Sequence, residues 1–506
     1  MNTPLALNQA NLSRLPDRLS RPTYDRGRLT TGIVHVGVGG FHRSHEAFYT
    51  DQLLESNGLE SDAAAQWGIC GVGLRQSDRK MATILKQQDY LYTLIVKHPD
   101  GKIETRVIGS IVDFLMGCDD PASVIDRMAD PATKIVSLSI TEGGYNVDAE
   151  TGEFDTSNPD ARHDVDHPSQ PKLVFGYLTA ALRKRRDGGL PAFTVQSCDN
   201  IQHNGDLTRK MLVGFARLQD PELAAWIDSE VRFPNAMVDR ITPVTTDADI
   251  EFLRTEFNVD DQWPVVCEPF CQWVIEDHFS AGRPDWQNVD VQFCSNVTPY
   301  EEMKLRLLNA GHSVLGILGS VYGYQTINEC IHDDLFRDFL RQFFDVEATP
   351  VLDAVEGIDL DQYKATLIER FGNPNIRDNL ARICLESSSK LPVFLIPTIY
   401  ENLAKGGSIR HAALVIAAWC YYSEKHADRH GQPLDVTDGL KESLHEAAKA
   451  TRDDRLSFLR IQQLFGDLAD NERFAQTYLE MLDRMDRTPD VSEHMRAVLG
   501  DAGGAS

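Results

Sequence analysis

The stretch Gly32-Ile-Val-His-Val-Gly-Val-Gly-Gly-Phe-His-Arg43 predicts how the first part of the chain folds. Its first residues form a short apolar strand that ends at Gly37, where a glycine turn begins. A helical pattern follows the turn as far as Leu54. A strand, a glycine turn and a helix in this order form the first unit of a nucleotide-binding α/β fold.

The glycine turn predicts a ligand as well as a fold. Gly37 and Gly39 would let the backbone approach a pyrophosphate closely, and the helix that follows would offer it unpaired N–H groups. The usual fingerprint has a third glycine, and His42 stands in its place. A tight turn without a ligand would show the same two glycines, but the flanking strand and helix favour a dinucleotide site.

A carboxylate for the ribose is expected after the second strand of such a fold. A second apolar strand covers 67–73, and Asp78 follows it five residues later. An acidic side chain at this place accepts hydrogen bonds from the ribose hydroxyls and repels a 2′-phosphate, which favours NAD over NADP. Asp78 could equally cap a helix over 79–85, and Arg75 nearby could tolerate a 2′-phosphate.

Strand and helix patterns alternate along the first 290 residues. We predict further strands over 91–96, 104–112, 134–140, 192–197 and 236–238, and helices over 122–128, 173–184 and 207–218. The turn at 99–102 is expected to join two of these strands as a hairpin. The alternation predicts a mostly parallel sheet. The first 30 residues are polar and irregular and are expected to lie on the surface as an arm.

The pattern changes after about residue 290. Helices are predicted over 305–322, 333–344, 395–403, 412–422 and 474–485, with almost no strand pattern from Glu301 onward. The predicted fold class is therefore α/β, with a Rossmann-type, mostly parallel sheet domain over 1–290 and an all-α C-terminal domain over 291–506.

The composition excludes several classes of partner. Lysine and arginine number 50 against 76 acidic residues, so the formal net charge is −26. Such a surface repels phosphate backbones and anionic membranes, so we expect no nucleic acid and no membrane as partner. The sequence shows no apolar signal region and no CxxC pair among its nine cysteines. We therefore expect a cytoplasmic protein with reduced thiols and no bound metal.

The segment Glu301-Glu-Met-Lys-Leu-Arg-Leu-Leu-Asn-Ala-Gly-His-Ser313 carries a polar trio in an otherwise apolar helix. At 100° per residue, Lys304, Asn309 and His312 lie at about 0°, 140° and 80°, so they share one broad face. A partly desolvated lysine loses basicity and can act as a base near neutral pH, and an asparagine amide can stabilise an alkoxide. Hydride transfer from a secondary alcohol needs both groups. Alternatively, Lys304 pairs with Glu301, and Asn309 marks a helix irregularity.

Other polar residues could contribute to the same chemistry. Asn200 and Asp239 each follow a predicted strand, where α/β sheets place functional side chains, and Asn200 is a candidate second amide for the oxyanion. Arg382 and Lys390 lie eight residues apart in helical sequence, about 80° apart on adjoining faces. They could instead form a solvated basic face.

These features together resemble the mannitol dehydrogenase family of polyol-specific long-chain dehydrogenases. The matching segments follow the family's order: GVGGFHRSHEAFYTDQLL (37–54), SLSITEGGY (137–145), SCDNIQHNG (197–205), VDRITP (238–243) and KLRLLNAGHSVLG (304–316). The spacing Lys-x4-Asn-x2-His, together with the upstream Asp-Asn pair, is the most specific of these signals.

The resemblance implies NAD-dependent, metal-free interconversion of D-mannitol and D-fructose. Lys304 would be the general base, Asn200 and Asn309 would hold the reacting oxygen, and Glu301 would gate proton exchange between Lys304 and water. The residues that would orient the polyol are His312, Asp239, Arg382 and Lys390. The residues that would bind the cofactor are Gly37, Gly39, Gly40, Phe41, His42, Arg43, Asp78 and Glu142. The family often has an acidic pair after the second strand; here Ser77 replaces its first member, so NADP would be excluded less strongly.

Other functions stay open at this point. A hexuronate reductase of the fructuronate or tagaturonate type would need an extra cation for the substrate carboxylate, such as Arg382 or Lys390. A polyol-phosphate dehydrogenase would need a basic clamp, which we do not identify. A non-catalytic NAD-binding regulator would be expected to lack the polar trio. The expected partner is a small polyol or ketose, and the expected assembly is a monomer or a small homo-oligomer.

Overall fold

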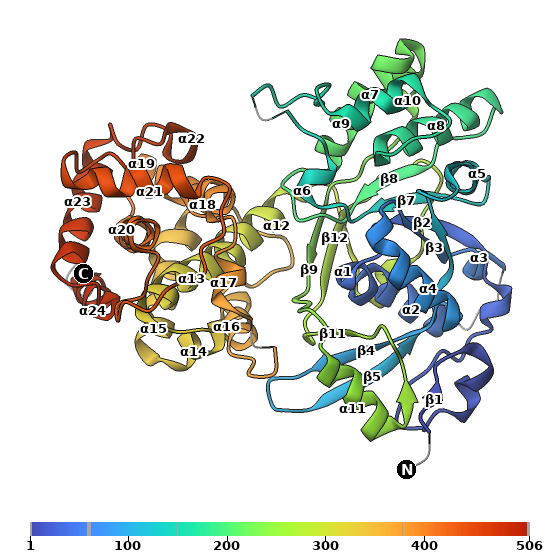
Figure 1. Cartoon of the computed structure of the whole chain (residues 1–506), viewed down its shortest axis with the longest axis horizontal. Helices are drawn as coiled ribbons and strands as arrows, with labels where there is room; N and C mark the ends of the chain where they lie inside the picture. The colour runs from blue at the N-terminus through green and yellow to red at the C-terminus, as the bar shows by residue number, and fades with distance from the viewer. Residues whose placement is uncertain (1–2, 58–61, 149, 377, 503–506) are drawn as a thin grey trace. The chain divides into compact units, whose positions relative to one another are not determined.

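The computed structural model describes residues 3–57, 62–148, 150–376 and 378–502. The chain forms two compact units, Met1–Thr298 and Pro299–Ser506. The first is an α/β unit built on a parallel sheet and the second is helical, so the predicted fold class is confirmed (Figure 1). The boundary predicted at residue 290 precedes strand β13 (Gln292–Cys294), which pairs with β12 (Gln272–Glu276) of the first unit.

Five parallel strands form the main sheet of the first unit, in the order β6-β3-β2-β7-β8 (Figure 1). Their bounds are Thr31–Val36 (β2), Gly68–Gly73 (β3), Ile111–Met116 (β6), Ile135–Leu138 (β7) and Thr194–Ser197 (β8). The chain starts at the central β2, moves outward through β3 to β6, and then continues on the other side with β7 and β8. This reversal leaves a crevice at the carboxyl ends of β2 and β7, where open α/β sheets bind ligands.

The main sheet is covered on both faces, which explains its apolar strands. Val34 and Val36 of β2 pack in a core with helices α5 (Pro121–Ala129), α8 (Val174–Asp187) and α9 (Asn204–Gln219). Ile33 belongs to a second core on the other face, to which α2 (Glu46–Asn57) and α4 (Arg79–Gln87) contribute. The remaining helices of this unit are α1 (Gly40–Ser44), α3 (Asp62–Ala65), α6 (Thr141–Gly144), α7 (Pro159–Asp166), α10 (Pro221–Glu230) and α11 (Asp247–Phe257).

Smaller sheets flank the main one. Strands β4 (Tyr92–Lys97) and β5 (Ile103–Ile108) form the predicted antiparallel hairpin, and β11 (Val265–Cys267) pairs with β4. Strand β9 (Ala236–Asp239) pairs with β12, and β1 (Leu5–Ala6) pairs with β10 (Val259–Asp260).

The single strand predicted over 104–112 is wrong, because two strands in different sheets occupy this segment. β5 ends at Ile108 and β6 starts at Ile111. The N–H of Gly109 donates to Oδ1 of the buried Asp51 at 2.9 Å, and the hydroxyl of Ser110 donates to the carbonyl of Ala47 at 2.7 Å. Because the backbone N–H of Gly109 is bonded to Asp51 of helix α2, it is lost to the strand ladder.

The predicted surface arm is largely exposed or half-buried, but a set of leucines anchors it to the unit. Leu7, Leu12, Leu15 and Leu19 are all at most 8 % exposed and form a core of their own with residues of β4, β5 and α11. The polar composition of the first 30 residues concealed this spaced set of leucines.

The second unit is built from helices around two buried ones. Helix α13 (Ala310–Tyr322) packs against α20 (Arg410–Lys425), which also contacts α21 and α23 (Figure 1). The other helices are α12 (Thr298–Met303), α14 (Ile327–His332), α15 (Asp334–Phe343), α16 (Leu360–Phe371), α17 (Leu380–Ile383), α18 (Ser387–Phe394), α19 (Ile396–Lys405), α21 (Lys441–Lys449), α22 (Gln462–Phe465), α23 (Glu472–Arg487) and α24 (Val491–Ala502). Among the residues described, no helix combines the length and the apolar character that crossing a bilayer requires.

Candidate active site

A cavity of about 290 Å³ opens at the crevice of the main sheet. Its walls come from the ends of β2, β3 and β7 and from the segment before α8. The lining residues are Val36, Gly37, Val38, Gly39, Leu74, Arg75, Asp78, Ser139, Ile140, Thr141, Gly144, Lys172, Leu173 and Val174. The predicted cofactor residues Gly37, Gly39 and Asp78 are therefore brought together at one cavity.

The turn at the end of β2 requires glycine at its first position. Gly37 has a φ of +95°, and a Cβ there would lie 2.1 Å from the carbonyl oxygen of Ser139 on the neighbouring strand. The chain can thus pass close to β7 only without a side chain. Helix α1 after the turn has only five residues, and the chain bends at His45 before α2 begins.

Asp78 lines the cavity and also closes a short turn. Its Oδ2 accepts the N–H of Arg75 at 3.0 Å, which caps the 3₁₀ turn Gln76–Asp78. Asp78 occupies the N-cap of α4 but makes no side-chain cap bond there, so the helix cap predicted as the alternative does not form. Arg75 lines the same cavity, so both side chains that bear on the 2′-position of a ribose face it.

The other predicted cofactor residues lie outside the lining of this cavity. Phe41 stacks on the ring of His45, with 4.8 Å between centroids. Arg43 is buried, donates to the carbonyl of Trp263 at 2.5 Å and lies over the ring of Tyr92; burial lowers its pKa to about 10. Gly40 opens α1, and Glu142 is exposed on α6.

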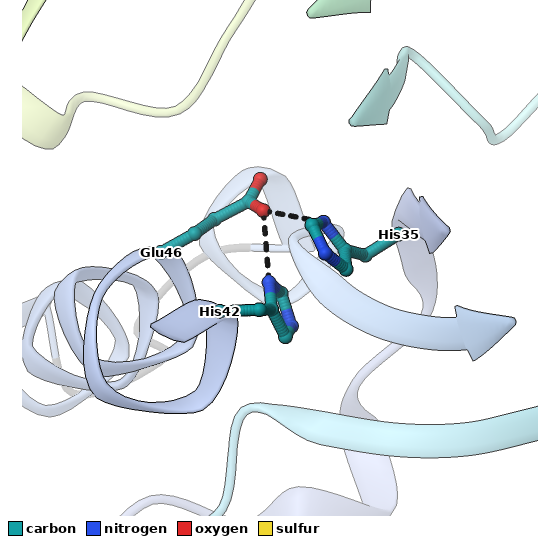
Figure 2. A group of neighbouring side chains, drawn as sticks. All are labelled: His35, His42 and Glu46. Carbon is teal, nitrogen blue, oxygen red and sulfur yellow. Dashed lines mark hydrogen bonds and ion pairs between the residues drawn. The ribbon is translucent and has the colours of Figure 1, made fainter. Parts of the chain in front are cut away.

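His42 belongs to a buried cluster with His35 of β2 and Glu46 of α2 (Figure 2). Oε2 of Glu46 lies 2.9 Å from Nδ1 of His35 and 3.1 Å from Nδ1 of His42, and it accepts the hydroxyl of Ser137 at 2.9 Å. Because a carboxylate only accepts, both imidazoles carry their proton on Nδ1. The cluster ties α1 and α2 to β2 and β7.

The cluster resembles a metal site in composition, but its ring geometry opposes one. The rings of His35 and His42 stack with centroids 3.5 Å apart and planes 16° apart. An ion bound to both Nδ1 atoms at about 2 Å would lie far out of both ring planes, whereas a metal bonds along the in-plane lone pair. Figure 2 shows both nitrogens directed at the carboxylate instead.

Burial and hydrogen bonding set the charges of this cluster. Burial, reinforced by the neighbouring His35, lowers the pKa of His42 to about 3, so its ring is neutral at pH 7. Burial alone would raise the pKa of Glu46, but the hydrogen bonds from both imidazoles outweigh it and hold that pKa far below its usual value. The cluster therefore holds a neutral His42 and an ionised Glu46.

Asn200 follows β8 and Asp239 is the last residue of β9, and one side chain links the two segments that carry them. Nδ2 of Asn204 donates to the carbonyl of Asp199 at 3.0 Å and to that of Ala236 at 2.8 Å, and its Oδ1 accepts the N–H of Ala236 at 2.9 Å. Asn204 thereby fixes the start of the loop that carries Asn200 to the strand that ends in Asp239. Asn200 is exposed, and Asp239 is 4 % exposed.

The helix predicted over 305–322 is confirmed over Ala310–Tyr322, but the lysine segment before it is not α-helical. Lys304–Asn309 forms a π-helix, and the N–H of Ala310 donates to the carbonyl of Leu305 five residues back. The wider turn of a π-helix reduces the angle between residues five apart to about 50°, so Lys304 and Asn309 share a face more closely than the predicted 140° allows. Lys304 is 6 % and Asn309 is 9 % exposed, and Oδ1 of Asn309 makes no hydrogen bond with any described residue.

The residues around this segment are also largely buried. Glu301 is 4 % exposed at the end of α12, and the ring of His312 stacks on Phe371 with centroids 4.3 Å apart. In a π-helix the backbone carbonyls do not make the ordinary i→i+4 hydrogen bonds of an α-helix. Such segments occur frequently at functional sites.

Arg382 and Lys390 do not share one helix, contrary to the prediction. Arg382 is in α17 and Lys390 is in α18, and Glu386 between them has a φ of +52° that breaks the helix. Nζ of Lys390 reaches back to the carbonyl of Ile383 at 3.1 Å. The guanidinium of Arg382 pairs with both oxygens of Asp378.

The sequence did not point to every residue of the cofactor cavity. The wall at 139–141 lies in the SLSITEGGY segment, so the resemblance indicated that region without naming Ser139, Ile140 or Thr141. No local pattern indicated Lys172 or Leu173, because they precede a helix far along the chain and reach the cavity only through the tertiary fold.

The comparisons with known proteins agree with this geometry. The chain matches the Mannitol dehydrogenase Rossmann domain over residues 31–288 and the Mannitol dehydrogenase C-terminal domain over residues 296–486. The chain belongs to the mannitol dehydrogenase family. The two family domains meet near the division between the structural units after Thr298.

Relatives of this mannitol dehydrogenase family member align over nearly its whole length. Mannitol 2-dehydrogenase of Aspergillus fumigatus is 47 % identical over 482 residues, which cover 93 % of this chain and 95 % of the relative. A Pseudomonas fluorescens mannitol 2-dehydrogenase, solved as a ternary complex with NAD and D-mannitol, has a TM-score of 0.87 at 44 % identity and covers 98 % of this chain and 100 % of that one. A D-sorbitol dehydrogenase in substrate-free form has a TM-score of 0.88 at 37 % identity, with 96 % and 99 % coverage.

Proposed function

We propose that this protein is an NAD-dependent mannitol 2-dehydrogenase that oxidises D-mannitol to D-fructose without a metal. The observation that carries the proposal is a buried lysine, Lys304, one π-helical turn from the buried amide of Asn309. The similarity to a mannitol 2-dehydrogenase solved with NAD and D-mannitol supports the substrate and the cofactor.

The cavity at the glycine turn fits a dinucleotide. A Cβ at Gly37 would fill the close approach between the turn and β7, and Asp78 offers a carboxylate to the ribose. NAD bound there would supply the hydride acceptor for C2 of the polyol. Lys304, in its neutral form, takes the proton of the C2 hydroxyl, so the alcohol loses one hydride and one proton and becomes a ketone.

The amides stabilise the oxygen while its charge develops. Asn200 and Asn309 donate hydrogen bonds to it, which needs no proton transfer. Asn309 is buried, which weakens competition from water and strengthens its bond. Glu301 passes the proton from Lys304 to water, and the residues that orient the polyol are His312, Asp239, Arg382 and Lys390.

A neutral substrate suits the proposed substrate-orienting cations better than a hexuronate does. The guanidinium of Arg382 is already paired with the buried carboxylate of Asp378, so its charge is offset before any substrate binds. A uronate carboxylate would have to compete with Asp378 for it. We further propose a cytoplasmic enzyme that acts as a monomer or small homo-oligomer and binds no nucleic acid.

A spectrophotometric comparison of substrates tests the proposal. We expect D-mannitol with NAD to give the highest rates, with smaller rates for D-glucitol and D-arabinitol, and no loss of activity in EDTA. Activity confined to fructuronate with NADH would establish the hexuronate reductase instead. Loss of turnover in EDTA that Zn²⁺ restores would refute the metal-free mechanism.

A further inference from the structure

Two buried aspartates of the first unit each hold part of the cofactor cavity wall by its backbone. Oδ2 of Asp199 accepts the N–H of Ile140 at 3.0 Å, and Oδ1 accepts the N–H of Thr141 at 2.8 Å. Ile140 and Thr141 both line the cavity. Asp199 itself is 8 % exposed, whereas the two bonds it accepts are partly buried.

Asp164 of α7 does the same for another part of the wall. Its Oδ1 accepts the N–H of Lys172 and its Oδ2 accepts the N–H of Leu173, each at 2.8 Å. Both residues line the cavity, and Asp164 is fully buried. Bonds of N–H groups to an ionised carboxylate are stronger than neutral ones, so each aspartate fixes its segment firmly.

Asp199 differs from Asp164 because its own segment continues into a proposed site residue. Asn200 follows Asp199 directly, and the carbonyl of Asp199 accepts a hydrogen bond from Asn204, which also bonds Ala236 of β9. The hydroxyl of Tyr145 donates to Oδ2 of Asp199 at 2.8 Å. The carboxylate and the backbone of this one residue therefore anchor both the cavity wall and the start of the Asn200 loop.

The wall segment held by Asp199 is strained. Thr141 has a φ of +61°, a left-handed conformation that residues with a branched Cβ rarely adopt. Such strain persists only where surrounding contacts impose it, and the bond from its N–H to Asp199 is such a contact.

We propose that Asp199 is a positioning residue that couples the cofactor wall at Ile140 and Thr141 to the Asn200 amide used in hydride transfer. The part of this inference that concerns Asn200 rests on the proposed function, whereas the part that concerns the cofactor wall does not. An amide in place of the carboxylate can accept with only one of its two atoms, and its NH₂ would face an N–H or an O–H donor.

The test compares three isosteric variants, each losing one buried carboxylate that accepts two backbone N–H groups. Asp199→Asn is expected to weaken NADH binding about tenfold and to lower kcat about tenfold or more, since bonds to charged groups are the stronger ones. Asp164→Asn is expected to weaken NADH binding by a similar factor with kcat within about twofold. Asp261→Asn is the stability control, because Asp261 accepts the N–H groups of Thr93 and Trp263 outside the cavity lining.

A rescue experiment separates positioning from general loss of structure. Thr141→Gly suits the left-handed φ and keeps the N–H, so in the Asp199→Asn background it is expected to restore NADH binding at least in part. Tyr145→Phe removes one bond to Asp199 and leaves both wall bonds, and it keeps the proposal testable if Asp199→Asn fails to fold. For Tyr145→Phe we expect a small rise in the NADH Kd and a larger fall in kcat.

Two results would overturn the inference. One is an Asp199→Asn enzyme whose NADH Kd and kcat change no more than those of Asp261→Asn. The other is a Tyr145→Phe enzyme with wild-type values of both. NADH binding is followed by fluorescence without any polyol. The role of Asp199 in holding the cofactor wall can therefore be confirmed even if mannitol proves to be the wrong substrate.

Discussion

The glycine turn and the lysine segment prepare the protein for chemistry in different ways. The turn contributes backbone, and at Gly37 it has no room even for a methyl group. The lysine segment contributes the side chains of Lys304 and Asn309, aligned by a π-helix in a buried setting. Substitutions in the first region should therefore change binding and stability, whereas substitutions in the second should change turnover.

The largest effect is expected from Lys304→Ala. Loss of a general base costs about 10² to 10⁴ in rate, so we expect kcat to fall about 10³-fold while the NADH Kd stays unchanged. Added primary amines should restore part of the rate. Lys405→Ala, at an exposed position at the end of α19, serves as the control. Full turnover of Lys304→Ala would show that the lysine segment does not supply the general base.

The next effect is expected at the turn. Gly37→Ala places a Cβ 2.1 Å from a carbonyl oxygen at a φ of +95°, so we expect NADH binding to weaken by at least about 10²-fold and the Tm to fall. Gly39→Ala is the matched control, because the nearest atom to its Cβ is 3.9 Å away, and it should keep the wild-type Tm. Calorimetry and fluorescence titration measure both, and equal Tm losses would contradict the steric argument.

A smaller effect on turnover is expected from Asn309→Ala. One donor to a developing oxyanion supplies about 10²-fold or more in rate, and a second amide would cover part of its loss. We therefore expect kcat to fall between about tenfold and 10²-fold with NADH binding intact. A change confined to the KM for mannitol would show that Asn309 binds the ground state rather than the transition state.

The smallest effect is a pH dependence of stability that originates near the turn. Burial lowers the pKa of His42 to about 3 and that of His45 to about 4, both below the unfolded value near 6.5. Above about pH 6.5 both states are neutral and nothing changes. Below that pH the two histidines bind protons in the unfolded chain but stay neutral in the folded chain. Each histidine therefore lowers the free energy of unfolding by up to ~1.4 kcal/mol per pH unit, until its folded pKa is reached.

Urea unfolding at pH 7.5, 6.0 and 5.0 measures this dependence. We expect the double variant His42→Gln and His45→Gln to lose stability less steeply with acid than the wild type. His332→Gln, an exposed position in α14, should keep the wild-type slope. Parallel slopes for all three proteins would place the acid sensitivity elsewhere.

The parts of the fold that could be predicted depend on local patterns. The strand Thr31–Val36 and its glycine turn could be predicted, because a strand buried on both faces needs a continuous apolar run and the turn needs glycine. The hairpin of β4 and β5 could be predicted from its turn residues. The three-residue strands β11 and β13 were missed, because so few residues carry no periodicity.

The candidate site shows the same limit. Lys304, Asn309 and His312 could be selected from residue type and spacing, but their predicted α-helical angles were wrong, because the i→i+5 bonding at Ala310 depends on how the segment packs. The break at Glu386 between Arg382 and Lys390 was missed for a similar reason, since a left-handed glutamate has no signature in sequence.

The sequence by itself determined the order of the elements, the glycine at the close approach and the chemical groups available for hydride transfer, since these depend on residue type and short-range spacing. Only the tertiary structure decided which distant backbone forms the cavity walls, that Asp199 and Asp164 hold them, and that His42 lies neutral in a buried cluster instead of in the cavity lining. The reason is physical: burial and hydrogen bonds between residues far apart in sequence set these positions and charges, and neither exists until the chain has packed.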